Sequence, residues 1–238
     1  MKQRLDQALA ATGLVNSRSQ AESYIRLGKV TVNKKVVTKA GALVADSDTV
    51  ELKTDEQYVS RAGLKLASVA QLFKLDFKGK TVLDVGSSTG GFTDYALRHG
   101  ATKVIAVEVG TNQLHPSLHG HPQIELHEKT DIRDFKTAER IDIIVADVSF
   151  ISLREILPSV SRLCGPETRL AIMVKPQFEA GHSNVKHKGV IKNDKMRRDI
   201  LKDFEEWARG RFVIIDKADS DVAGAKGNRE RFYLLQKL

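Results

Sequence analysis

The chain has 238 residues, of which 41% are hydrophobic and 29% charged, which excludes a disordered protein and favours one ordinary globular domain with a small one beside it. Lys and Arg outnumber Asp and Glu by 38 to 30, which favours nucleic acid over membrane as a partner. Cys164 is the single cysteine, so an intrachain disulfide and a thiolate metal cluster are excluded. We therefore expect a cytoplasmic protein without a metal. No stretch resembles a signal peptide or approaches the ~20 apolar residues of a membrane span.

Residues 1–55 read as a small basic domain with two helices and two strands. Apolar residues at helical spacing run up to Gly13. Ser17 and Gln20 have the spacing of a capping box and predict the start of a second helix. Gly28 predicts the end of this helix, as the first residue beyond its C-cap. The runs "KVTVNKKVV" and "DTVELK" are strand-like.

Basic side chains recur in this first part, and an ordinary solvated surface would explain their charge equally well. The stretch "RLDQALAATGLVNSRSQAESYIRLGKVTVNKKVV" resembles an S4 domain, a small RNA-binding module, in its Arg-Leu-Asp start, in Ser17-Arg18 and in Gly28-Lys29-Val30. Such modules hold structured RNA mainly through phosphates and shape. The basic residues that could form one face are Arg4, Arg18, Arg26, Lys29, Lys34, Lys35 and Lys39. With the resemblance, we expect RNA to contact six of them, which are Arg4, Arg18, Arg26, Lys29, Lys34 and Lys35.

Residues 56–79 read as a linker followed by the first helix of a catalytic domain. The segment "YVSRAGLKLASVAQLF" is largely apolar, and Lys65 stands among its apolar residues. Taken alone, Lys65 is explained by an amphipathic helix from which a long amine reaches solvent.

From residue 80 to residue 238, short β-branched runs alternate with helical segments. Four runs are strand-like, namely "TVLDV", "KVIAVEV", "IDIIVADV" and "RLAIMVKP". Helical segments between and after them include "SLREILPSVSRL" and "KMRRDILKDFEEWARG". The chain closes with the runs "RFVIIDKA" and "RERFYLLQKL". This alternation predicts an α/β domain with a parallel sheet covered by helices on both faces. Chemistry in such a domain lies beyond the carboxyl ends of the strands.

The stretch "TVLDVGSSTGGFTDYAL" predicts a strand, a small-residue loop and a helix, a unit that directs backbone N–H groups and the helix dipole at a ligand. A phosphate loop would need Lys after its last glycine, but Phe92 follows Gly91. A dinucleotide loop would need glycine at position 88, which is Ser. The loop therefore leaves two alternatives, an adenosine cofactor without phosphates, S-adenosylmethionine, and a purely structural turn.

Ionisable residues stand at successive predicted strand ends. Asp84 directly precedes the glycine loop, and Glu108 ends the next strand, where such folds place the acid that binds ribose hydroxyls. Asp131 follows a third strand and is placed to meet an adenine amino group. Asp147 and Lys175 end two further strands, and the proline after Lys175 keeps it extended. Each of these residues alone could be a helix cap or a solvated side chain, but together they indicate a site.

Six motifs occur in the order found in the TlyA family, once called haemolysin A. They are "DVGSSTGGFTDYAL", "AVEVGTNQLH", "EKTDIRD", "VADVSFISL", "VKPQFEAG" and "GNRE". The similarity runs from about residue 2 to the C-terminus. It implies an S4 domain joined to an FtsJ/RrmJ-like domain with the Rossmann-like class I methyltransferase fold, and S-adenosyl-L-methionine as cofactor. It also implies 2′-O-methylation of cytidine in ribosomal RNA. We expect large-subunit RNA, because the chain lacks the terminal extensions of longer family members.

FtsJ-like enzymes use a Lys-Asp-Lys-Glu tetrad, which matches Lys65, Asp147, Lys175 and Glu230. A ribose hydroxyl needs its proton removed or its developing alkoxide stabilised, and Lys175 is the expected activating residue, either as a neutral base or as a cation. The resemblance implies a set of cofactor-binding residues, which are Asp84, Gly86, Ser87, Ser88, Gly90, Gly91, Phe92, Glu108, Asp131 and Asp147. Further residues in "HSNVKHKGVIKNDKMRR" could neutralise RNA phosphates, namely Lys186, Lys188, Lys192, Lys195, Arg197 and Arg198.

Three positions depart from the family pattern. Glu108 stands where the family usually has Asp, and Asp131 where it usually has Asn. Arg231 follows Glu230 where an aromatic residue is usual, so the register of the last strand stays open. A membrane-active haemolysin and an RNA-binding protein without catalysis are the alternative functions. As partner we expect ribosomal RNA or a ribosomal subunit, with no membrane and no obligate protein partner.

Overall fold

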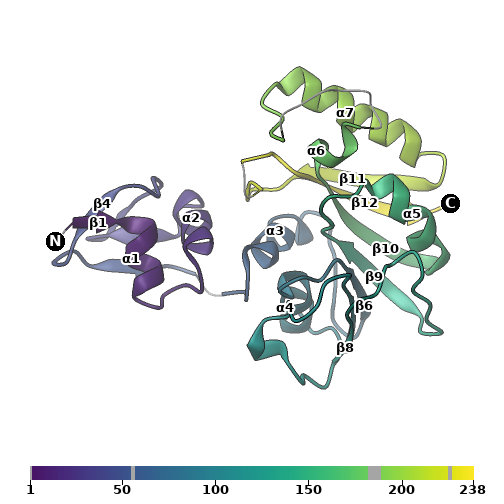
Figure 1. Ribbon diagram of the computed structural model, residues 1–238, viewed down its shortest axis with the longest axis horizontal. Helices are drawn as coiled ribbons and strands as arrows, with labels where there is room; N and C mark the ends of the chain where they lie inside the picture. The colour runs from purple at the N-terminus through teal and green to yellow at the C-terminus, as the bar shows by residue number, and fades with distance from the viewer. Residues whose placement is uncertain (1, 55–56, 182–188, 225–226) are drawn as a thin grey trace.

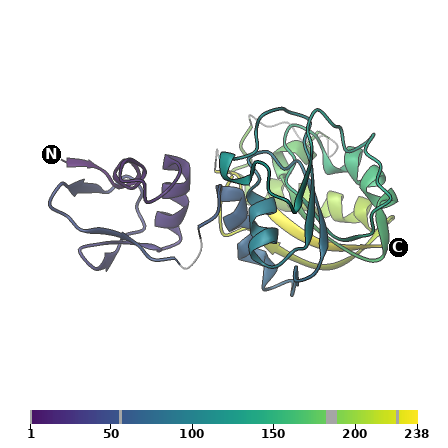
Figure 2. The same cartoon turned by 90° about the horizontal axis from the view of Figure 1, so that it is seen from below.

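The computed structural model describes residues 2–54, 57–181, 189–224 and 227–238. A small N-terminal domain lies beside a larger α/β domain (Figure 1). The view from below shows the same arrangement (Figure 2). Helix α3 (Arg61–Ala70) lies on the side of the larger domain that faces the smaller one (Figure 1).

The N-terminal domain packs two helices against short strands. Its elements are β1 (Lys2–Arg4), α1 (Leu5–Ala11), α2 (Arg18–Arg26), β2 (Val30–Val32), β3 (Lys35–Val36), β4 (Leu43–Ala45) and β5 (Val50–Leu52). The predicted start of α2 is confirmed, because the Ser17 hydroxyl accepts a hydrogen bond from the Gln20 N–H at 3.2 Å. Gly28 follows that helix with a φ of 69°. The pairing of β1 with β4 is absent from the prediction, because strands of three residues carry too little alternation to be recognised.

The linker before α3 is hydrogen-bonded to both domains. The Gln20 side-chain amide donates to the Tyr58 carbonyl at 2.7 Å, and the Val59 N–H donates to Asp94 Oδ2 at 2.8 Å. The rings of Tyr58 and Tyr95 lie 5.4 Å apart between centroids. These contacts connect α2 through the linker to α4 (Gly91–Arg98), the helix that follows the glycine loop.

Among the described residues of the larger domain, seven strands form one sheet in the order β11-β12-β10-β9-β6-β7-β8. The strands are β6 (Thr81–Val85), β7 (Lys103–Val107), β8 (Ile124–His127), β9 (Ile141–Ala146), β10 (Cys164–Val174), β11 (Phe212–Asp219) and β12 (Arg231–Lys237). The run from β6 to β10 is parallel, as predicted, but β12 is antiparallel to both of its neighbours. The predicted parallel sheet is therefore confirmed from β6 to β10, and β12 is the strand that departs from it. The described part of its connection from β11 contains no helix, whereas a parallel return needs a crossover.

Helices cover both faces of the sheet. Besides α3 and α4 they are the 3₁₀ turn η1 (Pro116–Leu118), α5 (Leu153–Arg162), α6 (Pro176–Glu179) and α7 (Asp194–Ala208). Neighbouring residues of β6 face opposite sides, since Val82 packs in the core that includes α3 and α4, whereas Leu83 packs in the core that includes α5 and α7. No helix among the described residues is long and apolar enough to cross a membrane.

The reversed direction of β12 determines which residues meet at the edge of the sheet. Val174 at the end of β10 pairs with Arg231 at the start of β12. The residues just outside this pair are Lys175 and Glu230. A glutamate before an antiparallel strand thus reaches the same edge as a lysine after a parallel one.

Candidate active site

Four ionisable side chains from different elements meet at the carboxyl edge of the sheet. Lys65 extends from α3, Asp147 follows β9, Lys175 follows β10 and Glu230 precedes β12. Lys175 Nζ lies 2.6 Å from Asp147 Oδ1. Lys65 Nζ lies 2.6 Å from Glu230 Oε2 and 3.7 Å from Asp147 Oδ2. Because two ammonium groups balance two carboxylates, these charges can be held together away from water.

Neither lysine is a solvated surface residue. Lys65 is 7% exposed and Lys175 is 8% exposed, so the amphipathic-surface explanation of Lys65 is wrong. Lys175 is extended, with φ of −105° and ψ of 104°, and the helix that starts at Pro176 follows it directly. Its amine donates to Ser149 Oγ at 2.7 Å. An ammonium group has three N–H donors, so the hydrogen bond to Ser149 and the ion pair with Asp147 leave at least one donor that can be directed at a substrate oxygen.

Glu230 is positioned by the turn that precedes β12. The Ser220 N–H donates to the Glu230 carbonyl at 3.0 Å. A Cβ atom at Gly224 would lie only 2.6 Å from Glu230 Oε1. Glycine at position 224 therefore leaves the space in which the Glu230 carboxylate reaches Lys65.

A cavity of about 370 Å³ adjoins the four-residue cluster, and Asp147 lines it. The loop after β6 forms one wall, with Gly86 and Ser88 in the lining. Gly86 has a φ of 78°, and a Cβ atom there would lie 3.1 Å from Val148 Cγ1 and 3.3 Å from the Asp147 carbonyl. Glycine therefore permits both the turn and the close approach of two strand ends.

Glu108 lines the cavity with a carboxylate that the backbone holds in place. The Ser88 N–H donates to Oε2 at 2.9 Å, and the Gly110 N–H donates to Oε1 at 2.8 Å. The Gln113 side-chain amide also donates to Oε1, at 3.5 Å. A carboxylate has about four acceptor positions, so Glu108 can accept one further hydrogen bond. A hydroxyl group, such as one of a ribose, matches this arrangement.

Asp131 lines the same cavity but is paired with a cation. The Arg133 side chain donates to Asp131 Oδ1 at 3.0 Å from Nε and to Oδ2 at 2.6 Å from Nη2. These hydrogen bonds lower the pKa of Asp131. The carboxylate therefore stays ionised and acts as an acceptor for an amino group.

Asp84 is buried behind the glycine loop. The Thr93 hydroxyl donates to its Oδ2 at 2.7 Å, while its Oδ1 has no hydrogen-bond partner among the described residues. Burial, with a smaller contribution from the negative charges of Asp147 and Glu108, raises the pKa of Asp84 to about 7. A cationic group bound next to the loop would stabilise the ionised form of Asp84.

Some residues predicted to bind a cofactor do not line the cavity. The Phe92 side chain is 2% exposed and packs in the core, 6.0 Å from the Phe232 ring between centroids. Gly91 faces α3 instead, since a Cβ atom there would lie 2.4 Å from Ser60 Oγ. The helix begins at Gly91, which turns these first side chains toward the core, and we correct the prediction for Phe92 accordingly.

Several residues that line the cavity are absent from the prediction, among them Phe150 and Gln113. Phe150 is 92% exposed and adopts a φ of 67°, with its ring 5.4 Å from that of Phe178 between centroids. Gln113 Oε1 accepts a hydrogen bond from the Ser88 hydroxyl at 3.0 Å. A large aromatic residue three positions after a strand-end Asp147 was the signal available for Phe150, whereas Gln113 lies in a loop that no pattern distinguishes.

The predicted RNA-binding residues of the N-terminal domain include two arginines held by one buried acid. Arg4 Nη2 lies 2.9 Å and Arg18 Nε 2.8 Å from Asp6 Oδ2. Hydrogen bonds from these arginines, chiefly from Arg4, lower the pKa of Asp6 to about 2. Asp6 therefore fixes Arg4 and Arg18 close together on the surface.

The second basic segment is only partly described. Lys186 and Lys188 lie outside the described residues. Arg197 is 5% exposed and donates to the Arg229 carbonyl at 3.0 Å and to Asp219 Oδ1 at 2.6 Å. It braces α7 against the end of β11, so we correct the expectation that Arg197 contacts phosphates.

Comparisons with known proteins agree with this architecture. Residues 58–237 match the model of the FtsJ-like methyltransferase family, and residues 3–50 match that of the S4 domain. The chain is 43% identical over 181 residues to the 23S rRNA (cytidine-2′-O)-methyltransferase TlyA of Campylobacter jejuni, which covers 75% of this chain and 70% of that protein. It is 34% identical over 239 residues to the 16S/23S rRNA (cytidine-2′-O)-methyltransferase TlyA of Mycobacterium tuberculosis, with 98% and 89% covered. A solved structure from Streptococcus thermophilus that carries the name hemolysin matches with a TM-score of 0.73 at 33% identity, covering 99% of this chain and 88% of that one. The chain therefore belongs to the FtsJ-like methyltransferase family and, with an S4 domain ahead of that domain, to its TlyA group.

Proposed function

We propose that this protein transfers a methyl group from S-adenosyl-L-methionine to the 2′-hydroxyl of a cytidine in ribosomal RNA, with large-subunit RNA as the preferred substrate. The observation that carries the proposal is the meeting of two lysines and two carboxylates directly beside a cavity with acceptors for ribose and adenine. The relative from Campylobacter jejuni is named a 23S rRNA (cytidine-2′-O)-methyltransferase and that from Mycobacterium tuberculosis a 16S/23S rRNA (cytidine-2′-O)-methyltransferase. Both names support cytidine in ribosomal RNA as the substrate, and the first supports large-subunit RNA.

The donors and acceptors of the cavity fit S-adenosyl-L-methionine. Glu108 would accept from a ribose hydroxyl, and Asp131 from the adenine amino group. Asp84 Oδ1, buried and without a partner among the described residues, would stabilise the ammonium group of the methionine end. When bound, the cofactor supplies an electrophilic methyl group.

The cluster would prepare the ribose hydroxyl for attack. The Lys175 amine is fixed by Asp147 and Ser149 and would direct its remaining donor at the 2′-oxygen, where negative charge develops. Lys65 lies within ion-pair distance of Glu230 and Asp147. Its positive charge would therefore balance these carboxylates while the Lys175 amine contacts the 2′-oxygen. A proton released from the hydroxyl would pass to this network.

Phe150 would hold the base of the target nucleotide. Its ring is exposed, lines the cavity mouth and belongs to the turn that carries Asp147 and Ser149. Enzymes that modify single nucleotides stack the displaced base on aromatic side chains. The left-handed backbone of Phe150 keeps the ring outside the core and available for such stacking.

Residues 1–55 would dock the RNA, and residues 80–238 would perform the chemistry, with residues 56–79 between them. The arginine pair on Asp6 and the exposed lysines Lys29, Lys34 and Lys35 supply phosphate contacts for docking.

The test is methyl transfer from labelled S-adenosyl-L-methionine to unmodified 16S and 23S transcripts and to assembled subunits. Digestion to nucleosides should place the label in 2′-O-methylcytidine, predominantly from large-subunit RNA. Label in a base, or in no RNA fraction at all, would overturn the proposal.

A further inference from the structure

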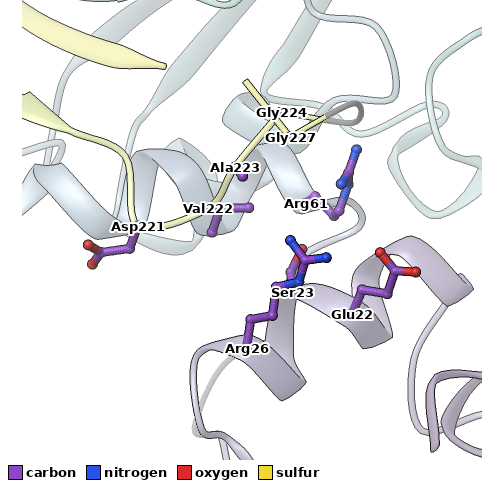
Figure 3. A pocket seen from close by; sticks show the side chains of 9 residues that line it. All are labelled: Glu22, Ser23, Arg26, Arg61, Asp221, Val222, Ala223, Gly224 and Gly227. Atoms are coloured by element: carbon purple, nitrogen blue, oxygen red, sulfur yellow. The ribbon is translucent and has the colours of Figure 1, made fainter. Parts of the chain in front are cut away.

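A second cavity, of about 270 Å³, lies between the N-terminal domain and the larger domain. Arg26 and Ser23 of α2 line one side, and Arg61 at the start of α3 lines another (Figure 3). The turn between β11 and β12 closes it with Gly224 and Gly227. The cavity is therefore built by both domains together.

The two arginines of this cavity are available for a ligand. Arg26 is exposed and Arg61 is half-buried. Neither makes a side-chain hydrogen bond or an ion pair with the described residues, whereas Arg4 and Arg18 of the same basic domain are both paired with Asp6. Figure 3 shows the Arg26 side chain extending from α2 toward α3, and the Arg61 side chain extending from the start of α3 away from α2. The planar guanidinium group with its forked donors is well suited to hold an anionic oxygen group.

The acidic residues of the lining are not both directed toward the arginines. The Asp221 side chain points away from the arginines (Figure 3). Glu22 stands on α2 beside Arg26, and the formal charges of the two arginines and two acids in the described lining balance. Because Asp221 is directed away, the space next to the two arginines is left with Glu22 as its one nearby carboxylate among the described residues. A phosphodiester carries one negative charge and would supply the second one there.

The cavity is also connected to the proposed catalytic cluster through two of its residues. Arg61 precedes Lys65 by four positions on α3, one helical turn or about 6 Å along the same face. A Cβ atom at Gly224 would lie only 2.6 Å from Glu230 Oε1, so this glycine packs directly against the Glu230 carboxylate. An RNA strand that presents a ribose to Lys65 and Lys175 thus passes close to this cavity.

Resting on the proposed function, we propose that this cavity, the interdomain cavity, binds one phosphate of the substrate RNA strand between Arg26 and Arg61. Its ligand class is a nucleic-acid backbone phosphate near the target ribose. Because one arginine comes from each domain, the bound phosphate fixes the N-terminal domain against the catalytic domain and sets the register of the strand at the catalytic cluster.

The test is the salt dependence of binding to a labelled, unmodified 23S rRNA transcript without cofactor. Each protein–phosphate contact contributes about 0.7–0.9 to the slope of log affinity against log salt concentration. We compare the wild type with Arg26→Ala, Arg61→Ala and the double variant. Lys202→Ala is the matched control, since Lys202 is an α7 side chain that is 77% exposed and outside the cavity.

Each single variant should lower the slope by about one contact and weaken binding at low salt by about tenfold. The double variant should lower the slope no further, because both arginines hold the same phosphate. Arg61→Lys should restore the slope, since it keeps the charge, but recover only part of the affinity, since it loses the forked donors. Lys202→Ala should bind as the wild type does.

Several results would overturn the proposal. Additive slope losses in the double variant would mean two separate phosphates, and unchanged binding of either single variant would mean no phosphate in the cavity. An equal loss of affinity and salt slope for Lys202→Ala would mean that the arginine variants act through the overall charge of the protein. The readout is independent of methyl transfer, so a protein that binds RNA in this way but methylates none would refute the proposed function alone. An active protein whose arginine variants bind normally would refute the interdomain cavity alone.

Discussion

Replacing Lys175 by Met tests whether this amine activates the ribose hydroxyl. Methionine keeps the length and apolar stem but removes the 2.6 Å contact with Asp147 and the 2.7 Å hydrogen bond to Ser149. Asp147 retains Lys65 at 3.7 Å, so the loss of stability should stay below the 3–5 kcal/mol of a fully broken buried pair, at about 1–3 kcal/mol. The rate of methyl transfer should fall by roughly 10²–10⁴-fold, the usual contribution of a positioned acid–base group.

The assay for Lys175→Met is single-turnover methyl transfer with cofactor and RNA both saturating, because that rate is insensitive to weakened binding. Ser149→Ala is the matched control, since it removes the hydrogen bond made by the same amine but keeps the charge, and its rate should fall less than about tenfold. Cofactor affinity should be unchanged in Lys175→Met, because Lys175 does not line the cofactor cavity and Glu108 and the glycine loop belong to other strands. A Lys175→Met protein with nearly the wild-type rate would refute the assignment and leave Lys65 as the candidate.

Three further predictions concern other parts of the site. Burial raises the pKa of Asp84 from 3.8 to about 7, so the contribution of the protonated carboxyl to the free energy of unfolding is fully present below pH 4 and is lost as pH rises to about 7. The free energy of unfolding in urea, wild type minus Asp84→Asn, should therefore decline by roughly 4 kcal/mol between these pH values. A difference that does not change with pH would contradict the burial argument. Gly224→Ala should displace the Glu230 carboxylate and slow methyl transfer by about 10²-fold at unchanged cofactor affinity, and single-turnover rates equal to the wild type would show that this position is tolerant. Glu108→Ala should weaken S-adenosyl-L-methionine binding by tenfold or more in calorimetry, while NAD should bind neither protein; tight NAD binding would reverse our interpretation of the loop.

The parts of the site that the sequence predicted are those governed by local rules. Parallel strands bring their carboxyl ends to one edge, so Glu108, Asp147 and Lys175 could be grouped from their positions after β-branched runs. The glycine loop was recognisable because left-handed residues such as Gly86 need glycine. The capping residue Ser17 likewise acts within its own turn.

The parts that the sequence did not predict depend on contacts distant in the chain. Glu230 was assigned to the tetrad from the family resemblance alone, because its approach to the site depends on the antiparallel pairing of β12 with β10, which no local pattern specifies. In the sequence, Arg197 looks like one more residue of a basic surface, but its ion pair with Asp219 makes it unavailable for phosphate contacts. Phe92 follows the glycine loop, but the helical start turns its ring into the core.

We propose that the cluster of Lys65, Asp147, Lys175 and Glu230 promotes methylation of a ribose hydroxyl of ribosomal RNA. The decisive experiment is mass mapping of 23S rRNA incubated with S-adenosyl-L-methionine and either the wild type or Lys175→Met. We expect one added methyl group on the ribose of a cytidine with the wild type, and none at that nucleotide in the same time with the variant. A methyl group located on a base, or equal modification by both proteins, would contradict it.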